Sequence, residues 1–359
     1  MKIYLVGGAV RDKLLGIEPK EKDWVVVGST PQEMKKNGFK QVGKDFPVFI
    51  HPKSGEEYAL ARTERKAGHG YTGFEFDTDS NVTLEEDLQR RDLTINAIAE
   101  DESGELIDPF QGKEDIINKK LRHVSDAFSE DPLRVLRLAR FMVKFPQFKV
   151  VPTTVDMVTE IVDSGELAYL TGERVWLEIY KSNHIDKFYS ALEYLGATEK
   201  IIGIRMINRL QKMDFEEEAS SKLSKKIHQI SYFIKSCVDD VDTFCDELKI
   251  PNEYRDLAKI LKKCELDILE YVPEKGEYDR LLELIDKLDI RKTERLKSFF
   301  ECIDIANERK IFFKSFIGRI KNFRVDEENQ KKSKDEIMKL VRNNHREIAK
   351  DHILNYLNS

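Results

Sequence analysis

The sequence predicts an α+β protein, with a small mixed sheet and its helices first and an all-helical remainder after them. Over residues 1–140, short apolar runs bounded by glycine or charged residues alternate with amphipathic segments. After Phe141, leucine, isoleucine and phenylalanine alternate with lysine and glutamate at helical spacing. The 359 residues leave room for two or three domains and a substantial core.

The first apolar run ends in two glycines and leads into a short amphipathic segment. Gly7 and Gly8 allow a strand-to-helix turn with positive φ and let a phosphate come close to the backbone. The N–H groups of a helix that starts near Ala9 would face the same anion, and Arg11 can add a fork of donors. A glycine turn alone usually only connects two elements. With an acidic pair close by in the sequence, it predicts a site for a nucleoside triphosphate.

The acidic pair is Glu21 and Asp23, at the mouth of a strand predicted over residues 24–27. Because side chains alternate faces along a strand, residues i and i+2 point the same way. Mg²⁺ favours one or two protein carboxylates together with phosphate oxygens, and two such ions can hold the attacking and leaving oxygens of a phosphoryl transfer. An acidic pair alone is most often solvated. Next to the glycine turn, it predicts a Mg²⁺ site.

Further motifs follow in order along the first 141 residues. They are Arg62-Thr-Glu-Arg65-Lys66, Arg90-Arg91-Asp92-Leu-Thr-Ile-Asn96, Asp108-Pro-Phe-Gln-Gly112 and Glu130-Asp131-Pro-Leu-Arg134-Val-Leu-Arg137-Leu-Ala-Arg140-Phe141. With the glycine turn and the acidic pair, this series resembles the catalytic head of the tRNA nucleotidyltransferases, the CCA-adding enzymes of the bacterial and eukaryotic class.

The resemblance implies a division of the chain into three parts. Residues 1–140 are expected to form a DNA polymerase β-like nucleotidyltransferase head. Residues 141–200 are expected to form a helical neck with the nucleotide-selecting helix at its start. Residues 201–359 are expected to form a helical body and tail that bind tRNA.

The metal pair departs from the family pattern. The family has Asp-x-Asp, whereas this chain has Glu21-Lys22-Asp23. Glutamate is longer by one methylene, and Mg²⁺ demands near-octahedral coordination at about 2.0–2.1 Å. Because the surrounding motifs are intact, we expect a backbone shift to absorb the difference, in preference to a weakened metal site or a loss of activity.

Arg90 and Arg91 lie late in a segment, residues 83–98, that we expect to be helical. Thr83 can cap its N-terminus, and three acidic residues in the first turn suit the positive end of the helix dipole. Most arginine pairs of this kind are exposed and salt-bridged. The resemblance assigns contact with the bound triphosphate to Arg91, and leaves Arg90 as an RNA or structural contact.

A helix is predicted at residues 130–141, capped by Ser129 and with a proline in its first turn. Its three arginines, Arg134, Arg137 and Arg140, recur every three residues, so each is rotated by about 60° from the last. Arg134 is therefore best placed for a base edge. Arg137 and Arg140 are better placed for phosphates or for a facing domain.

Asp131 and Arg134 together suggest a template made of protein. Asp131 can accept from the exocyclic amino group that cytosine and adenine share, and Arg134 can donate to ring acceptors. This pair would select C and A without a nucleic-acid template, and the resemblance implies the same role. The ordinary alternative is an i,i+3 pair that stabilises the helix by a few tenths of a kcal/mol.

Residues 62–82 hold Gly68, Gly70, Gly73 and many charges without periodicity, which predicts a loop that is functional or disordered. In the family, a flexible loop here helps the switch from adding C to adding A. Glu57, in the strand-like run before it, could be a third acid near the metals, although a solvated strand residue is the favoured interpretation.

After Phe141 periodicity predicts a series of helices, and beyond about residue 185, where the resemblance is slight, it is the only guide. The helices are expected at residues 153–162, 171–181, 186–195, 219–237, 240–249, 254–270, 276–288, 292–307, 312–321 and 334–357. Lysine-rich stretches in this part could line an RNA surface, although a solvated face is the better interpretation of any one of them.

Composition sets further bounds. The net charge of −6 gives no general support for RNA binding, so any tRNA contact needs a local patch. Four cysteines without metal-ligand or redox spacing fit a reducing cytosol. The sequence shows no signal peptide and no apolar run of membrane-spanning length, so a cytoplasmic location is expected. It gives no indication of an oligomeric state.

Some bacterial relatives carry a C-terminal His-Asp phosphohydrolase domain. The seven histidines of this chain show no clustered H…HD…D pattern, so no phosphatase activity is expected. The leading interpretation is a Mg²⁺-dependent enzyme that adds CCA to tRNA from CTP and ATP, with Glu21 and Asp23 on the metals, Gly8, Arg11 and Arg91 on the triphosphate, and Arg137 and Arg140 assisting.

Three alternatives remain open at this point. A bacterial poly(A) polymerase shares the head motifs, but the negative net charge and the lack of a basic tail weigh against it. A partial enzyme that adds only CC or only A is the second alternative. The third is a catalytically weak tRNA-binding protein, in which Glu21 in place of aspartate would be a sign of lost catalysis.

Overall fold

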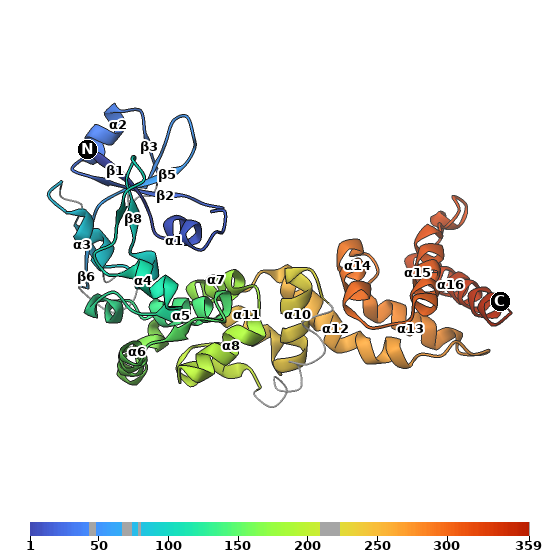
Figure 1. Cartoon of the computed structure of the whole chain (residues 1–359). Helices are drawn as coiled ribbons and strands as arrows, with labels where there is room; N and C mark the ends of the chain where they lie inside the picture. The colour runs from blue at the N-terminus through green and yellow to red at the C-terminus, as the bar shows by residue number, and fades with distance from the viewer. Residues whose placement is uncertain (43–47, 67–73, 78–79, 209–222, 359) are drawn as a thin grey trace. The chain divides into compact units, whose positions relative to one another are not determined.

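The computed structural model describes residues 1–42, 48–66, 74–77, 80–208 and 223–358 (Figure 1). The chain forms two compact units, each with its own core. Unit 1 comprises Met1–Arg205 with Glu247–Lys249, and unit 2 comprises Met206–Asp246 with Ile250–Ser359.

Unit 1 is built on a seven-stranded sheet of order β3-β4-β5-β2-β1-β8-β9. Its strands are β1 (Lys2–Val6), β2 (Asp23–Val27), β3 (Lys40–Val42), β4 (Val48–Ile50), β5 (Glu57–Leu60), β8 (Ala99–Glu100) and β9 (Leu106–Ile107). Strands β2 and β5 run parallel, and the other neighbouring strands are antiparallel. The predicted mixed sheet is confirmed.

Alternation along β2 divides its side chains between two apolar clusters. Val25 packs with residues of β1, β8 and helix α3 (Leu84–Gln89) on one face. Val26 packs on the other face with Phe49 and with Met34 of helix α2 (Pro31–Lys36). Trp24 joins this second face and stacks on Tyr58 at 5.6 Å between ring centroids. Asp23 therefore faces the side of the sheet that α3 covers.

The head differs from the prediction in two places. The helix expected over residues 83–98 ends at Gln89, after which a 3₁₀ turn, η2 (Thr94–Asn96), and β8 follow. The segment expected to be a loop at residues 62–82 contains an antiparallel hairpin, β6 (Thr63–Lys66) with β7 (Phe74–Asp77). Gly68, Gly70 and Gly73 lie outside the described residues.

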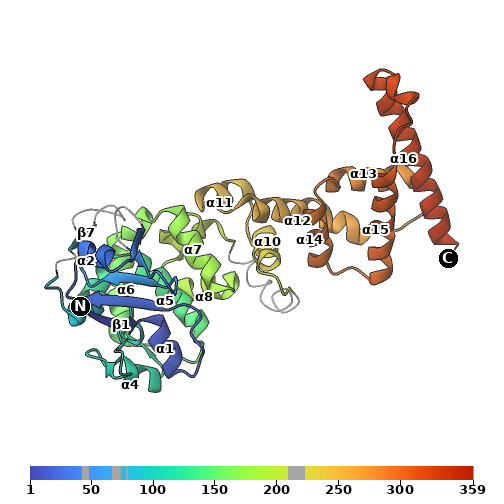
Figure 2. The ribbon, with the colours of Figure 1, turned by 90° about the horizontal axis from the view of Figure 1, so that it is seen from above.

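The remainder of unit 1 is mainly helical. Its elements are α1 (Gly8–Leu14), α4 (Gly112–Ile117), β10 (Lys120–Leu121), η3 (Asp126–Glu130), α5 (Leu133–Lys144), β11 (Lys149–Val150), α6 (Pro152–Ser164), η4 (Glu166–Tyr169), α7 (Gly172–Ser182), α8 (Ile185–Tyr194), η5 (Thr198–Lys200) and η6 (Ile204–Met206). Helix α5 packs against α7 and α8, and α1 lies beside β1 (Figure 2).

A short piece of later chain completes unit 1. A Cβ added to Gly172 would lie 1.9 Å from the Glu247 carbonyl oxygen, so the start of α7 and residues 247–249 are in direct backbone contact. Leu248 packs closely over Gly203 in the same way. Unit 1 thus takes segments from two places in the sequence.

Unit 2 is helical throughout its described part. Its helices are α10 (Lys226–Cys237), α11 (Val241–Glu247), α12 (Asn252–Glu270), α13 (Tyr278–Leu288), α14 (Thr293–Cys302), α15 (Asn307–Asn322) and α16 (Lys334–Leu357), with the 3₁₀ turn η7 (Asn329–Lys331). One core of leucine, isoleucine and phenylalanine joins α12 to α16. Each helix overlaps a range that periodicity predicts, but some ends differ. Helix α10 starts at Lys226 and not at residue 219, and residues 219–222 of the expected range lie outside the described residues. Helix α14 ends at Cys302 and not at residue 307, and α15 starts at Asn307 and not at residue 312.

The four cysteines are buried and form no disulfide with one another. Burial raises the pKa of the Cys245 thiol to about 11 and that of Cys302 to about 12, so both stay protonated near neutral pH. In the part of the chain that the structure describes, no helix has both the length and the apolar character that crossing a bilayer requires.

Candidate functional site

The predicted metal ligands lie at the start of strand β2. Asp23 is its first residue, and Glu21 lies in a bend two residues earlier, so strand alternation fixes the face of Asp23 but does not by itself fix that of Glu21. Asp23 is directly opposite Glu57 in the parallel β2–β5 pair, and the two side chains leave the same face. We call Glu21, Asp23 and Glu57 the metal edge.

The three carboxylates of the metal edge are exposed. Within the described ranges, none of them has a recorded hydrogen bond or ion pair with another protein side chain. Lys22, between the first two, instead approaches Glu56 at 3.8 Å. The metal edge therefore presents anionic oxygens that no cation among the described side chains neutralises.

The glycine turn follows the next strand of the sheet. Gly7 has φ +71°, donates its N–H to the Ile98 carbonyl at 3.2 Å and precedes helix α1, which starts at Gly8, one residue before the expected start near Ala9. A Cβ on Gly7 would lie 2.9 Å from Nη1 of Arg91, so only glycine lets this guanidinium lie against the turn. The structure thus brings the glycine turn and Arg91 together from residues far apart in the sequence.

Arg11 has a different environment from the one expected of a phosphate ligand. It is 4% exposed and packs against the rings of Phe141 and Phe145, each 5.3 Å from its guanidinium carbon. Its Nε donates to Asp12 at 2.8 Å and its Nη1 to Asn96 at 2.5 Å. Burial lowers the pKa of Arg11, although Asp12 opposes the shift. Direct contact with a triphosphate would require Arg11 to leave these partners.

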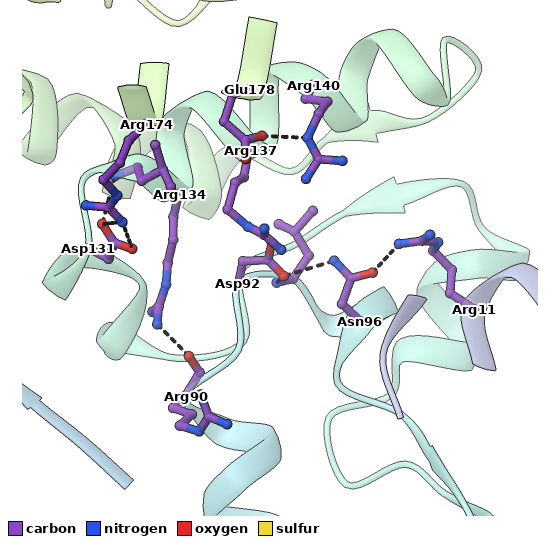
Figure 3. Close-up of polar contacts among 12 residues, drawn as sticks. Arg11, Arg90, Asp92, Asn96, Asp131, Arg134, Arg137, Arg140, Arg174 and Glu178 are labelled. Carbon is purple, nitrogen blue, oxygen red and sulfur yellow. Dashed lines mark hydrogen bonds and ion pairs between the residues drawn. The ribbon is translucent and has the colours of Figure 1, made fainter. Parts of the chain in front are cut away.

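Asp92 joins this arrangement to helix α5 (Figure 3). Its Oδ1 accepts from the Asn96 amide at 2.9 Å, and its Oδ2 accepts from Nε of Arg137 at 2.7 Å. Burial opposes ionisation of Asp92, but the charge of Arg137 and the hydrogen bonds of Asn96, Arg137 and the Leu93 N–H outweigh it, and the pKa of Asp92 lies well below its usual range. Arg11, Asn96, Asp92 and Arg137 therefore form one hydrogen-bonded chain.

Asp87 is a second buried carboxylate, with no exposed area. Its Oδ1 accepts from Nη2 of Arg90 at 2.5 Å, and its Oδ2 accepts from Nη2 of Arg91 at 3.0 Å. Desolvation opposes its charge, but the two arginines prevail and lower the pKa of Asp87. A comparable pair links Arg140 to the buried Glu178 of α7 at 2.5 Å.

We call the buried carboxylates and the side chains that they hold the arginine–carboxylate network. Its members are Asp87, Arg90, Arg91, Asp92, Asn96, Arg137, Arg140 and Glu178.

The two base-selecting candidates are placed differently from the prediction. Helix α5 starts at Leu133, so Asp131 precedes it in an extended conformation and Ser129 is not its cap. Asp131 Oδ1 instead accepts from the Leu133 N–H at 3.0 Å, and the carboxylate is held by Nη2 of Arg174 at 2.9 Å. The extended backbone of Asp131, and not helical spacing, sets its position relative to Arg134.

Arg134 is 6% exposed and reaches across to the head (Figure 3). Its Nη2 donates to the Arg90 carbonyl at 2.6 Å, and its Nη1 donates to the Ala127 carbonyl. Arg134 is thus joined directly to the backbone of Arg90, next to Arg91.

The Asp108–Gly112 motif caps helix α4 and packs it against the turn η2. Both carboxylate oxygens of Asp108 cap helix α4, accepting from the N–H groups of Gly112 at 2.7 Å and Lys113 at 2.8 Å. A Cβ on Gly112 would lie 2.1 Å from the Thr94 carbonyl oxygen, so glycine lets α4 pack on the turn that carries Asn96. The motif fixes the backbone of η2.

The sequence argument missed three residues that hold site side chains: Asp87 and Glu178 of the network, and Arg174 outside it. Asp87 had a local signal, since it stands three and four residues before the two arginines that it binds. Arg174 and Glu178, which hold Asp131 and Arg140, had none, because each pair is separated by about forty residues of sequence.

Comparisons with known proteins agree with this geometry. Residues 3–122 match the family model described as the poly A polymerase head domain. A multifunctional CCA protein of Aliivibrio salmonicida is 42% identical over 343 residues, which cover 84% of this chain and 84% of that protein. A CCA-adding enzyme of Coxiella burnetii is 44% identical over 313 residues, covering 86% of this chain and 82% of that enzyme.

A solved structure shares the fold. The apo form II of a CCA-adding enzyme superposes with a TM-score of 0.70 at 21% identity, over 99% of this chain and 91% of that chain.

Proposed function

Since this chain belongs to the CCA-adding enzyme family, we propose how its own residues perform the family's reaction, the template-independent addition and repair of the 3′-terminal CCA of tRNA with CTP and ATP and release of pyrophosphate. The observation that carries this function is identity above 40% to CCA-adding proteins over more than four fifths of the chain. The poly(A) polymerase likeness is confined to the head.

The metal edge is proposed to bind the divalent ion that nucleotidyltransferases of this superfamily generally use. Exposed carboxylates that bind no cation among the described residues fit a hard ion that prefers oxygen ligands, and we propose Mg²⁺ in particular. Glu21 and Asp23 would hold it. The described part of the chain places no group of three acidic, histidine or cysteine side chains where they could share a metal ion, so Glu57, opposite Asp23 in the strand register, is not counted among the ligands. When bound, the ion would lower the pKa of the RNA 3′-hydroxyl and polarise the α-phosphate.

Triphosphate binding is proposed to use the glycine turn and Arg91. The support is the close approach of Arg91 to Gly7, together with a buried Nε of Arg91 that has no hydrogen-bond partner among the described residues. Gly8 supplies its backbone N–H at the start of α1. These donors would bind the phosphate oxygens that leave as pyrophosphate.

Arg11, Arg137 and Arg140 remain proposed members of the nucleotide site. Their partners Asn96, Asp92 and Glu178 favour positioning roles for them, since each arginine already directs at least one donor at a protein oxygen. The positive charge of all three still favours a bound triphosphate.

Base selection is proposed to rest on Asp131 and Arg134. Arg174 and the Leu133 N–H fix the Asp131 carboxylate, and two backbone carbonyls fix Arg134, so both are held before a nucleotide arrives. A held acceptor and a held donor select the amino-bearing edges of cytosine and adenine with little loss of side-chain entropy.

The test is addition to tRNA that lacks its last three nucleotides, with Mg²⁺ and labelled CTP or ATP. Three added residues followed by arrest support the proposal. A long ladder of A would indicate a poly(A) polymerase, arrest after CC or after a single A would indicate a partial enzyme, and tight tRNA binding without incorporation would indicate a binding protein.

We further propose that the enzyme works in the cytoplasm and that its helical half binds the tRNA. Buried cysteines that form no disulfide with one another are typical of a reducing compartment and support the first proposal. The proposed parts at residues 1–140, 141–200 and 201–359 remain the functional division of the chain.

A further inference from the structure

Asp87 stands at the meeting point of two halves of the proposed nucleotide site. It lies in helix α3, has no exposed area, and uses both carboxylate oxygens. Oδ2 accepts from Arg91, whose other terminal nitrogen lies against the glycine turn. Oδ1 accepts from Arg90 and, at 3.3 Å, from the backbone N–H of Arg62. The Asp87 carboxylate therefore holds the side chains of Arg90 and Arg91 and the backbone N–H of Arg62, just before strand β6.

The Arg90 side of Asp87 leads to base selection. The guanidinium of Arg90 also donates to the Arg62 carbonyl at 3.0 Å, so Arg90 is anchored at the root of the β6–β7 hairpin. This anchoring fixes the backbone of Arg90, whose carbonyl accepts from Nη2 of Arg134 at 2.6 Å. A shift of the Arg90 backbone would therefore move the acceptor that orients Arg134.

We propose that Asp87 is a positioning residue that couples triphosphate binding by Arg91 to base selection by Arg134. The inference rests on the proposed roles of those two arginines and adds the physical link between them. Because Asp87 has no exposed area, it acts through the side chains that it holds.

The chemistry of the carboxylate explains why Asp87 can serve both sides. An ionised carboxylate accepts on both oxygens, so it satisfies donors on opposite sides at once. Asparagine keeps the shape but has one oxygen. Its oxygen would stay with Arg90 and the Arg62 N–H, where most donors converge, and its NH₂ group would then face Nη2 of Arg91, donor against donor. The charge that holds both arginines would also be lost.

The test compares Asp87→Asn with Arg91→Ala and Arg134→Ala, using KM and kcat for CTP and ATP together with misincorporation of UTP and GTP. Asp87→Asn is expected to raise KM for both correct nucleotides by roughly tenfold, as loss of a charge-assisted hydrogen bond implies, and also to relax discrimination several-fold. A change in only one of the two quantities, or in neither, overturns the coupling.

Two further variants make the test decisive. Asp115→Asn is the matched control, because Asp115 is buried to a similar degree in unit 1 but pairs with Arg122 and Thr94, away from both site arginines. Because Asp115 has no hydrogen bond or ion pair with Arg91 or Arg134 among the described residues, the variant is expected to change neither quantity. Arg90→Ala leaves the Asp87–Arg91 pair in place, so it should relax discrimination with less effect on KM. Unchanged discrimination in Arg90→Ala overturns the proposal even if Asp87→Asn does not fold.

The same measurements separate this inference from the proposed function. If Arg91→Ala leaves KM unchanged, or Arg134→Ala leaves selectivity unchanged, the assigned roles themselves are wrong. If those two variants behave as expected and Asp87→Asn does not combine their effects, only the coupling is wrong. Binding of ATP without tRNA, measured by calorimetry, gives the affinity loss of Asp87→Asn independently of turnover.

Discussion

The metal edge and the arginine–carboxylate network lie in the same unit and are built from the same kinds of charge, yet in opposite ways. Glu21, Asp23 and Glu57 are exposed, and none has a recorded cationic partner in the described chain. Asp87, Asp92 and Glu178 are buried, and each is bound by arginine. The carboxylates of the metal edge can bind a cation from solution. The buried carboxylates already bind arginine side chains and hold them in place.

The difference separates function from stability. An exposed carboxylate can be removed at little cost to folding, because surface substitutions usually change stability by no more than about 0.5 kcal/mol. Removing one member of a buried pair leaves an uncompensated charge and costs about 3–5 kcal/mol. The two regions should therefore respond to mutation in different observables.

The largest expected effect is that of Asp23→Ala, which should abolish nucleotide addition. Asp23 is exposed at the start of β2, so the melting temperature should stay close to that of the wild type. Incorporation of labelled CTP into truncated tRNA and a thermal melt by circular dichroism measure the two quantities. If Asp23→Ala lost its folded structure as well as its activity, the metal edge would matter for stability too, and the difference between the two regions would be wrong.

Glu21 tests the same region more finely. Glu21→Asp should retain or raise addition, since it restores the family's pair, whereas Glu57→Gln should leave addition close to that of the wild type. Full activity of Glu21→Ala would show that this residue holds no metal.

The second effect is on stability. Asp92→Asn should lower the unfolding free energy of unit 1 by about 3 kcal/mol, because it removes the charge that Arg137 and Asn96 bind in the interior. Both tryptophans, Trp24 and Trp176, lie in unit 1, so urea unfolding followed by tryptophan fluorescence reports on this unit alone. A variant as stable as the wild type would mean that burial, and not pairing, dominates at Asp92.

The third effect concerns selectivity. Arg134→Ala should reduce discrimination of CTP and ATP against UTP and GTP by about tenfold, since one good donor pair to a base edge is worth about 1–3 kcal/mol. Single-turnover incorporation of each nucleotide measures it. Arg122→Ala is the control: it also removes an arginine bound to a buried carboxylate, Asp115, but the Arg122 guanidinium has no hydrogen bond or ion pair with Asp131 or Arg134 among the described residues. Equal loss of discrimination in both would indicate a general loosening of the unit.

The smallest effect is a pH dependence of the unfolding free energy, which arises from the buried carboxylates. The folded-state pKa values of Asp87 and Asp92 are lowered, so their contribution is complete above the unfolded value of about 3.9 and is lost as pH falls below it. The stability gap between wild type and Asp92→Asn should stay constant from pH 7 to pH 5, and should narrow by about 1.4 kcal/mol per pH unit below about pH 4. A gap that narrows already between pH 7 and 6 would point to another titrating group.

The sequence predicted elements better than it predicted partners. Periodicity located the helices of unit 2 because their burial follows a local repeat, as the core from α12 to α16 shows. It failed at residues 83–98, where the apolar positions after Gln89 are buried by a 3₁₀ turn and a strand instead of by a helix. It also missed the hairpin, although Phe74 and Phe76 alternate with acidic residues as a strand would.

For the site, motifs predicted the candidate residues themselves: Glu21, Asp23, Arg91, Asp131 and Arg134. They did not predict the residues whose hydrogen bonds fix these side chains. Arg174 reaches Asp131 and Arg134 reaches the Arg90 carbonyl only after the chain has folded. No local spacing encodes such contacts. Asp131 illustrates the error that results, since helical spacing was applied to a residue that lies before the helix.

The contact between Gly172 and Glu247 has a consequence for how this protein is made. The early part of the chain cannot reach its finished packing until residues 247–249 have been synthesised, because they cover the start of α7 and the turn at Gly203. At a translation rate of about 5–20 residues per second, the ribosome adds the intervening stretch within several seconds. During that interval the start of α7 and the turn at Gly203 stay uncovered in the nascent chain. A chain that ended at residue 205 would leave them uncovered permanently.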